Sequence, residues 1–292
     1  VYINTKKFMK KIREFLTPIF FKFPVLISII EILRYYTGYF VYKYNLFLNK
    51  VYIGGYLFSQ QEIGRGRHHI IKKILNLLIK KNNSDVKKKE IEILEIGSYC
   101  GESALLFGNF LLNKNVSFKI TCVDIWGPYP FKNLRGFYSK KFNANIINGK
   151  VFNLFKHNMK KSNFHKNIIP IKGDSNKLLK KLKKKFDLIF VDGSHSYKYV
   201  YNDIKNSIKL LNNNGFLIGD DYEQSYKQTK YLNFKKLIRN NIDSIYDKKT
   251  KKNFHPGVTL AVHQLLGDIP NINGLFVQKL VNKKFINIKI KN

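Results

Sequence analysis

Three aspartates stand where two apolar runs of the chain end, and they are the strongest candidates for chemistry. Asp192 closes the run that begins at Phe186, and Asp220 and Asp221 close a later run. If the two runs are neighbouring parallel strands, their carboxyl ends meet at one edge of the sheet, where open α/β sheets bind ligands. Carboxylates without a matching group of His or Cys favour a hard cation such as Mg²⁺ over zinc. The pattern therefore predicts a metal site of Asp192, Asp220 and Asp221.

His195 follows Asp192 closely enough to turn back over the same site. An imidazole titrates near neutral pH, so we expect His195, or Asp192 itself, to act as a general base. The alternative, in which His195 only belongs to a turn and the paired aspartates only begin a loop, stays open. We assign no role to the histidines at positions 157, 165, 255 and 263, because none has an acid at an informative spacing.

A turn with two glycines follows an earlier apolar run, in the segment Leu94-Glu95-Ile96-Gly97-Ser98-Tyr99-Cys100-Gly101-Glu102-Ser103. Gly97 and Gly101 allow the backbone to turn tightly and to approach a ligand, and the helix that begins there offers free N–H groups. The spacing lacks the extra glycine of the GxGxxG loop, which admits a dinucleotide pyrophosphate. The Glu95 carboxylate suits a ligand with a cationic end. A strand, turn and helix without any ligand is the open alternative.

Polar residues also follow the next two apolar runs. Asp124 ends the first of them, where an acid accepts hydrogen bonds from both ribose hydroxyls. The position suits NAD and S-adenosylmethionine equally, so it predicts a nucleoside ligand, and helix capping is the other interpretation. Asp174 and Ser175 follow the second run and predict a contact with an adenine edge, which is compatible with capping the next helix.

From residue 90 onward, short apolar runs alternate with amphipathic segments, which is typical of βαβ units. The expected strands span 91–96, 118–123, 168–171, 188–191, 216–218, 276–280 and 285–290. The expected helices span 103–112, 151–161, 176–184 and 199–211. Asn282 and Lys283 separate the last two strands, and this short break predicts a hairpin. The sequence thus predicts an α/β fold over residues 85–292: a Rossmann-like, seven-stranded, mostly parallel sheet with a C-terminal antiparallel hairpin.

Residues 1–84 differ from this pattern and predict a basic, aromatic, helical extension. One apolar side of a helix is formed by Ile70, Ile71, Ile74, Leu75, Leu77 and Leu78, and we expect it to pack on the domain that follows. The stretch 15–47 predicts a packing helix as well. A helix that lies in a membrane interface is the alternative for that stretch, and pairing of two subunits through these helices also stays open.

The composition excludes a disordered chain, because 44% of the residues are hydrophobic and 15% are aromatic. Lys and Arg number 53 against 19 Asp and Glu, a net charge of +34 that indicates either a basic surface or codon bias. Cys100 and Cys122 lie in apolar runs and predict buried thiols. No apolar run reaches the length of a spanning helix, and no secretory cleavage site follows one. We therefore expect a cytoplasmic protein, with peripheral membrane contact as an open alternative.

The segments from Leu94 to Ser103, from Val191 to Tyr197 and from Gly219 to Tyr222 resemble class I S-adenosylmethionine-dependent methyltransferases. Within that class they are similar to the small-molecule O-methyltransferases of the catechol and macrolide-sugar type. The resemblance implies the metal ligands Asp192, Asp220 and Asp221, which is closer to the sugar-modifying branch than to the catechol branch. It implies a cofactor site of Glu95, Gly97, Ser98, Gly101, Ser103, Asp124, Trp126, Asp174, Ser175 and Asp192.

The activity implied is metal-assisted transfer of a methyl group from S-adenosylmethionine to a hydroxyl of a sugar, glycan precursor or secondary metabolite, with Mg²⁺ or another hard cation. We expect the long connections 127–149 and 222–256 to select the acceptor. An RNA methyltransferase is the first alternative, favoured by the basic run 180–185, although that run also suits the solvated face of a helix. A non-catalytic membrane-surface or binding protein that keeps the fold is the second.

Overall fold

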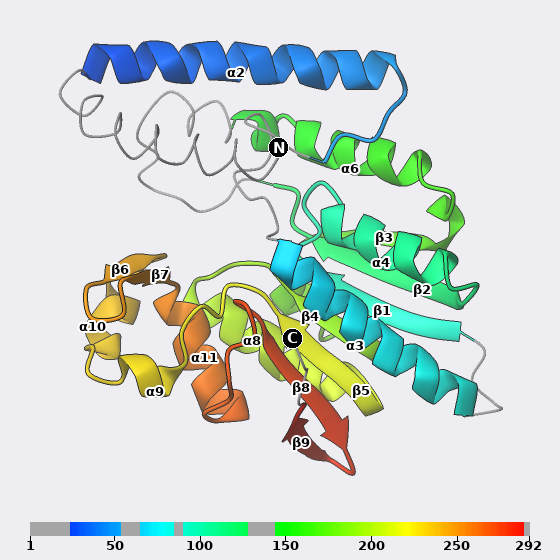
Figure 1. Cartoon of the computed structure of the whole chain (residues 1–292), viewed down its shortest axis with the longest axis vertical. Coiled ribbons are helices and arrows are strands. Elements are labelled where there is room, and N and C mark those ends of the chain that lie inside the picture. Colours follow the sequence, from blue (N-terminus) through cyan, green and yellow to red (C-terminus); the bar gives the residue numbers. More distant parts are fainter. Residues whose placement is uncertain (1–23, 54–64, 85–89, 128–143, 289–292) are drawn as a thin grey trace, which may run out of the picture.

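A single seven-stranded sheet forms the centre of the computed structural model, which describes residues 24–53, 65–84, 90–127 and 144–288 (Figure 1). Its strands lie in the order β3-β2-β1-β4-β5-β8-β9. The first five are parallel, whereas β8 is antiparallel to β5 and to β9. The strands are β1 Glu90–Ile96, β2 Ser117–Asp124, β3 Ile168–Lys172, β4 Phe186–Val191, β5 Leu211–Gly219, β8 Phe276–Val281 and β9 Lys284–Asn287. This confirms the predicted sheet and its C-terminal hairpin.

The strand order reverses between β1 and β4. The chain moves outward from β1 to β2 and β3, and then returns to place β4 on the other side of β1. Asp192, just after β4, donates its backbone N–H to the carbonyl of Ile96 at the end of β1 (2.8 Å). The two turns that carry the candidate residues therefore meet at the reversal, which is where open α/β sheets bind ligands.

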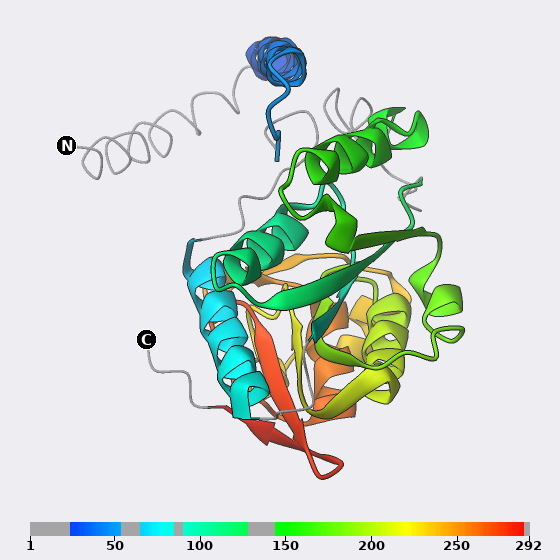
Figure 2. The same ribbon diagram turned by 90° about the vertical axis from the view of Figure 1, so that its right-hand side faces the viewer.

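Helices cover both faces of the sheet (Figure 2). One apolar core joins the sheet to α3 Arg65–Ser84, α4 Glu102–Leu112 and α6 Lys150–Lys160. The other core joins the opposite face to α8 Tyr197–Leu210 and α11 Pro256–Leu266. Three of the four helices predicted within the sheet domain, which correspond to α4, α6 and α8, are confirmed to within two residues at each end.

Helix α3 is built into the first core although it precedes the sheet in the chain. Ile70, Ile71 and Ile74 are completely buried, and they lie in the same apolar cluster as β1. The predicted packing of this helix is confirmed, except that Leu77 is exposed. Cys100 and Cys122 are buried free thiols, also as predicted.

Helix α2 Pro24–Phe47 stands apart from the sheet, at the top of Figure 1. Tyr35 and Tyr42 are buried against the rest of the chain, and the Tyr42 ring meets Tyr52 at a centroid distance of 5.6 Å. The backbone of Tyr52 is fastened to α6, because Asn158 accepts from its N–H (2.9 Å) and donates to its carbonyl (2.8 Å). Within the described ranges we find no helix with the length and hydropathy that crossing a bilayer requires.

One prediction of local structure is wrong, and one stretch for which the sequence predicted no elements contains several. The helix expected over 176–184 is only the short turn of α7 Ser175–Leu178, because the lysines that follow place like charges one turn apart. The stretch 222–256 contains short helices and strands that the sequence analysis did not predict. They are α9 Tyr226–Thr229, α10 Phe234–Arg239 and a hairpin of β6 Ile245–Asp247 and β7 Lys252–Phe254. These elements are too short to show a period. Most of the other predicted connection, 128–143, lies outside the described residues.

Candidate active site

The turn from Gly97 to Gly101 joins β1 to α4 and has room for backbone only. Gly97 has φ +93° and Gly101 has φ +88°, a region that L side chains rarely adopt. A Cβ atom on Gly97 would overlap the carbonyl of Asp192, and one on Gly101 would overlap the side chain of Met159. Ser98, inside the turn, is 2% exposed. The turn therefore packs closely against the end of β4. A ligand bound at this turn would lie close to both β1 and β4.

Glu95 lies beneath this turn and is completely buried. The hydroxyl of Ser103, in the first turn of α4, donates to its carboxylate. Burial raises the pKa of Glu95, and the hydrogen bonds from Ser103 and Ser98 oppose that shift. A carboxylate in such surroundings is stabilised by a nearby cationic group, which is the role that the sequence predicts for Glu95.

Asp124 ends β2 with both carboxylate oxygens oriented by the backbone. The N–H of Trp126 donates to one oxygen (2.6 Å) and the N–H of Tyr99 donates to the other (2.9 Å). Burial raises its pKa, and these two hydrogen bonds lower it. Each oxygen keeps lone pairs for a further donor, so the geometry suits a pair of hydroxyl groups.

Trp126 is placed in the core rather than toward a ligand. Its ring packs against both Phe152 and Phe155, at centroid distances of 4.5 and 4.7 Å. Its indole N–H donates to the carbonyl of Tyr99 (2.8 Å). Trp126 is not among the residues that line the cleft described below, and its hydrogen bonds link the Asp124 and Tyr99 segments.

A cleft opens beside this turn, at the reversal of the strand order. Four of the predicted cofactor residues line it: Gly97, Asp124, Asp174 and Ser175. Asp174 also caps α7, because it accepts from the N–H of Asn176 (2.9 Å). The sequence analysis missed Ile125, Tyr199 and Asp203, which line the same cleft. Tyr199 and Asp203 are four residues apart on α8, a spacing that could have indicated a shared face.

The three predicted metal ligands gather at the ends of β4 and β5. Asp220 and Asp221 are each 4% exposed, and Asp192 is partly buried. Burial, followed by the charges of Asp220 and Asp221, raises the pKa of Asp192 well above its ordinary value. Burial and the Asp221 charge also raise the pKa of Asp220, to about 6. The structure thus concentrates negative charge in a chain that is otherwise strongly basic.

Arg67 of α3 neutralises part of this charge, and nothing in the sequence pointed to it. Its guanidinium lies 2.6 Å from Oδ2 of Asp220 and 3.4 Å from Oε1 of Glu223. It packs against Gly274, where a side chain would overlap the guanidinium. One candidate metal ligand is therefore paired with an internal cation.

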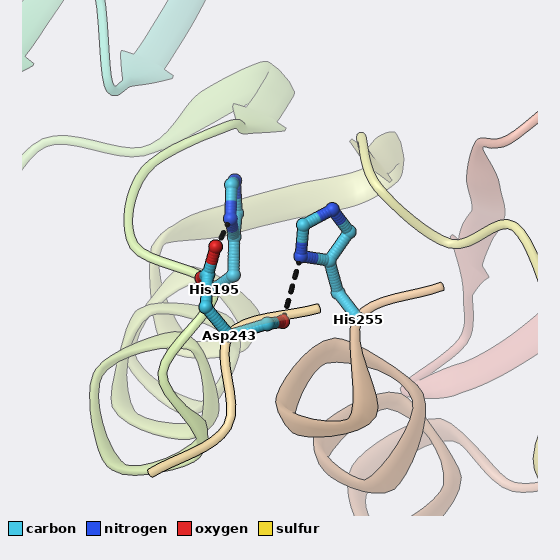
Figure 3. A group of neighbouring side chains, drawn as sticks. All are labelled: His195, Asp243 and His255. Carbon is cyan, nitrogen blue, oxygen red and sulfur yellow. Dashed lines mark hydrogen bonds and ion pairs between the residues drawn. The ribbon is translucent and has the colours of Figure 1, made fainter. Parts of the chain in front are cut away.

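His195 is paired through both of its ring nitrogens. Nε2 lies 2.8 Å from Oδ2 of Asp221, and Nδ1 lies 3.1 Å from Oδ1 of Asp243 (Figure 3). Burial lowers the pKa of His195, but the hydrogen bonds and charges of the two aspartates outweigh it and raise the pKa to about 11. Both ring nitrogens are therefore engaged by carboxylates, an arrangement that favours the protonated ring. The role of general base, for His195 or for Asp192, stays a prediction.

His255 also belongs to the site, although the sequence analysis assigned it no role. Its ring lies 4.1 Å from that of His195, and its Nε2 lies 3.9 Å from Oδ1 of Asp221. Its Nδ1 is 2.9 Å from the backbone carbonyl of Asp243 (Figure 3). Asp243 and His255 flank the β6–β7 hairpin, so folding of the segment 222–256 brings them to His195.

The donors suit a hard cation in their chemistry but only partly in their arrangement. Among the described residues, three donor atoms come within 4.8 Å of one another in two sets, His195 with Asp243 and His255, and Asp221 with Glu223 and His255. The predicted set of Asp192, Asp220 and Asp221 is not one of them. A cation held by that set would have to compete with Arg67 for Asp220 and with His195 for Asp221. The raised pKa of Asp192 indicates that a cation there would relieve repulsion.

Comparisons with known proteins agree with this architecture. Residues 94–222 match the family model described as a methyltransferase domain. An uncharacterized protein of Acanthamoeba polyphaga mimivirus, R132, is 27% identical over 169 residues, which cover 56% of this chain and 64% of that protein. The chain thus spans slightly less than two thirds of the length of this relative.

Among solved structures, the O-methyltransferase NovP superposes with a TM-score of 0.51 at 13% identity, and the match covers 77% of this chain and 83% of that chain. An O-methyltransferase from Bacillus cereus, in complex with SAH, has a TM-score of 0.42 at 15% identity, over 75% and 88% of the two chains. Residues 94–222 thus match a methyltransferase-domain model, and the fold of the chain is similar to that of the O-methyltransferase NovP.

Proposed function

We propose that the protein transfers the methyl group of S-adenosylmethionine to a hydroxyl of a small acceptor, either a sugar, a glycan precursor or a secondary metabolite. One observation carries the proposal: the cleft and the acidic cluster share a wall, because Gly97 of the cleft is in backbone contact with Asp192. A ligand that fills the cleft toward Gly97 would present its end beside Asp192. The likeness to the O-methyltransferase NovP supports a hydroxyl acceptor, and the three carboxylates support the sugar class through the resemblance described above.

The proposed cofactor pose follows the polar groups of the cleft. Asp124 would accept both ribose hydroxyls, Asp174 and Ser175 would flank the adenine, and Glu95 would attract the amino group of the methionine part. Each of these carboxylates is buried or held by backbone N–H donors, which limits the reorganisation needed on binding.

The proposed reaction is an in-line displacement. A hydroxyl oxygen of the acceptor forms a bond to the methyl carbon as the bond from that carbon to the sulfonium sulfur breaks, which leaves a methyl ether and S-adenosylhomocysteine. Asp192 takes the hydroxyl proton, helped by the raised pKa that burial and its acidic neighbours give it. A divalent cation held by Asp192, Asp220 and Asp221 would lower the pKa of the acceptor hydroxyl.

His195 would act as a fixed cation in this scheme. It holds Asp221 in place, and through Asp243 it connects the acidic cluster to the segment 222–256. Ser196 makes a second connection, because its hydroxyl donates to the side chain of Asn241 (2.7 Å). We propose that this segment forms the acceptor side of the site.

Isothermal titration of S-adenosylmethionine into the full chain, with and without Mg²⁺, tests the cofactor site. We expect micromolar binding that Asp124→Ala removes. Because Asp124 also accepts from two backbone N–H groups, Asp124→Asn is measured beside it, and circular dichroism reports whether each variant is folded. Glu90→Ala is the matched control, because Glu90 begins β1 at the edge of the sheet opposite to the cleft. No heat from folded wild-type protein would contradict the proposal.

Methyl transfer from radiolabelled cofactor to a panel of nucleotide sugars, catechols and RNA then tests the acceptor class. Transfer to RNA alone, with the steep salt dependence of phosphate contacts, would favour the RNA alternative over the small-molecule proposal.

A specific surface supports a second proposal, that α2 lies on an anionic membrane surface. Leu33, Tyr36, Phe40, Tyr44 and Phe47 are spaced three or four residues apart and are 61%, 57%, 70%, 54% and 82% exposed. A continuous apolar stripe of this kind is typical of an interaction surface. Residues 1–53 carry nine Lys and Arg against two Glu, so their charge complements anionic lipid.

Flotation with vesicles tests this surface. We expect the full chain to float with phosphatidylglycerol vesicles more than with phosphatidylcholine vesicles, and Phe40→Ser/Phe47→Ser to lose that binding. Tyr246→Ser/Ile286→Ser removes two exposed apolar side chains from other elements and is the control. Equal binding by both double variants would overturn the proposal. Self-association that only the α2 variant loses, without vesicle binding, would assign the stripe to a second copy of the chain instead.

A further inference from the structure

Two histidines and one aspartate from separate segments of the chain face one another beside the acidic cluster. His195 lies between β4 and α8, Asp243 precedes β6, and His255 precedes α11. Each of these side chains offers one possible ligand atom, and the three atoms lie within 4.8 Å of one another. Figure 3 shows Asp243 beside both rings, with its carboxylate toward His195 and its backbone carbonyl toward His255. The set contains none of the three aspartates considered above for a hard cation.

Close backbone packing holds the two imidazoles near each other. A Cβ atom on Gly257 would overlap the backbone carbonyl of His195, so the start of α11 packs directly on the turn after β4. His255 stands two residues before Gly257, and its ring centroid is 4.1 Å from that of His195. The two histidines therefore need little rearrangement to bind one ion together.

His195 already has the outer partner that metal-bound histidines commonly have. Its Nδ1 is 3.1 Å from Oδ1 of Asp243, whereas its Nε2 is 2.8 Å from Oδ2 of Asp221. A histidine that binds a metal through one nitrogen usually donates its other N–H to a carboxylate or carbonyl, which fixes the tautomer and the ring. Nε2 of His255 also lies 3.9 Å from Oδ1 of Asp221. Asp221 thus stands outside this set as the residue that orients its ligands.

The set is accessible to solvent, chiefly at Asp243. The side chain of Asp243 is 49% exposed, and those of His195 and His255 are 23% and 13% exposed. An ion can therefore enter from solvent and keep a water molecule as a further ligand. Two imidazole nitrogens and one carboxylate oxygen suit a borderline ion such as Zn²⁺, whereas Mg²⁺ prefers oxygen ligands alone.

We propose that His195, Asp243 and His255 form a site for a transition-metal ion of the Zn²⁺ class, separate from the hard-cation site at the ends of β4 and β5. The ion takes the place of the proton between His195 and Asp243, so both residues keep a positive charge between them. Because its ligands come from separate segments, the ion fastens the segment 222–256 to the turn after β4. The inference does not depend on S-adenosylmethionine or on methyl transfer.

Titration of Co²⁺ into the full chain, without a histidine tag and after treatment with EDTA and dialysis, tests the site. Co²⁺ serves as the probe for Zn²⁺, because its visible absorption reports a site of low coordination number, and Mg²⁺ contributes no absorption. We expect one equivalent of Co²⁺ to bind with a micromolar Kd, Zn²⁺ to displace it, and a roughly 100-fold excess of Mg²⁺ to leave it bound. Zn²⁺ should also raise Tm, because the ion binds the folded arrangement.

His255→Gln removes one imidazole and should weaken Co²⁺ binding by about 10-fold or more. His263→Gln is the matched control, because His263 also faces an acid, with Nδ1 3.0 Å from Oδ1 of Asp268. Among the described residues, His263 belongs to no group of three such donors. We expect this variant to keep the wild-type affinity. Thermal unfolding in EDTA shows whether each variant is folded.

The outcomes separate this site from the acidic cluster and from the proposed function. No tight binding of Co²⁺ to folded wild type would overturn the proposal, and this result needs no variant. Binding that His255→Gln retains and Asp192→Asn loses would assign the ion to the acidic cluster and would also overturn it. Equal weakening by His263→Gln would mean binding to scattered histidines, with the same consequence. Loss with His255→Gln alone supports the site, whether or not S-adenosylmethionine binds.

Discussion

The guanidinium of Arg67, on the helix that precedes the sheet, lies 2.6 Å from Oδ2 of Asp220 at the end of β5. The Asp220 side chain is 2% exposed and that of Arg67 is 20% exposed, so solvent screens the pair only weakly. The same carboxylate is the one that a divalent cation would need. The basic helical segment therefore contributes a charge directly to the candidate active site.

Replacing Arg67 with methionine should make the stability of the protein depend on divalent cation. Removing one partner of a buried ion pair leaves an uncompensated charge, which costs roughly 3 kcal/mol. We expect Arg67→Met to lower Tm in EDTA, and excess Mg²⁺ to restore most of the loss. Arg67→Lys keeps the charge and is the control. An equal loss in EDTA and in Mg²⁺ would mean that Arg67 does not share Asp220 with a cation.

Replacing Asp192 with asparagine should remove the proton acceptor while the cofactor cleft stays intact. The backbone of Asp192, which contacts Gly97, is unchanged by this substitution. We expect kcat to fall by about 10² to 10⁴-fold and the Kd for S-adenosylhomocysteine to stay within a few-fold. Single-turnover methyl transfer and calorimetry measure the two quantities. Retained turnover would exclude Asp192 as the base, and Glu90→Gln serves as the matched control.

Alanine at position 97 should prevent cofactor binding, because its Cβ would overlap the carbonyl of Asp192. Gly267 has a similar φ of +81°, but a Cβ atom there would meet no atom within 4 Å, so Gly267→Ala isolates the backbone strain. Gly267 has φ 81° and ψ −166°, a combination that essentially only glycine adopts, so we expect Gly267→Ala to cost about 1 to 3 kcal/mol. We expect Gly97→Ala to cost more than that, with loss of binding. Urea unfolding compares them. Equal costs would show that overlap at the turn is unimportant.

The raised pKa of Asp203 should appear in the pH dependence of stability without ligand. Its pKa is about 7 in the folded protein against 3.8 for an ordinary Asp, so the folded state holds a proton that the unfolded state has lost. Stability due to this group therefore falls as pH rises from about 4 to about 7 and is constant above. Each pKa unit is worth about 1.4 kcal/mol, so the loss is on the order of a few kcal/mol.

Asp203→Asn cannot ionise and should therefore gain on the wild type over this range. We expect the difference in Tm between variant and wild type to grow from pH 4 to pH 7 and then to stay level, in the interval set by the two pKa values. A difference that does not change with pH would mean that the carboxylate is ionised throughout.

Short-range patterns in the sequence determined much of the site. The alternation of apolar runs and amphipathic helices predicted the parallel sheet, and parallel strands end at the same edge. That is why Asp192, Asp220 and Asp221 could be placed near one another, and why Gly97, Asp124 and Asp174 could be placed at one cleft. Each of these residues ends a strand or lies within two residues of a strand end, so its position depends mainly on the strand itself and on the handed connections between strands.

Tertiary structure alone decided what surrounds these residues. Arg67 reaches Asp220 only because α3 packs on the sheet, and Asp243 reaches His195 only because the short elements of 222–256 fold back over it. The sequence predicted that His195 titrates near neutral pH, whereas two carboxylates from distant segments raise its pKa. Charge state, pairing and burial depend on contacts between residues far apart in the chain. The spacing of residues along the chain does not predict those contacts.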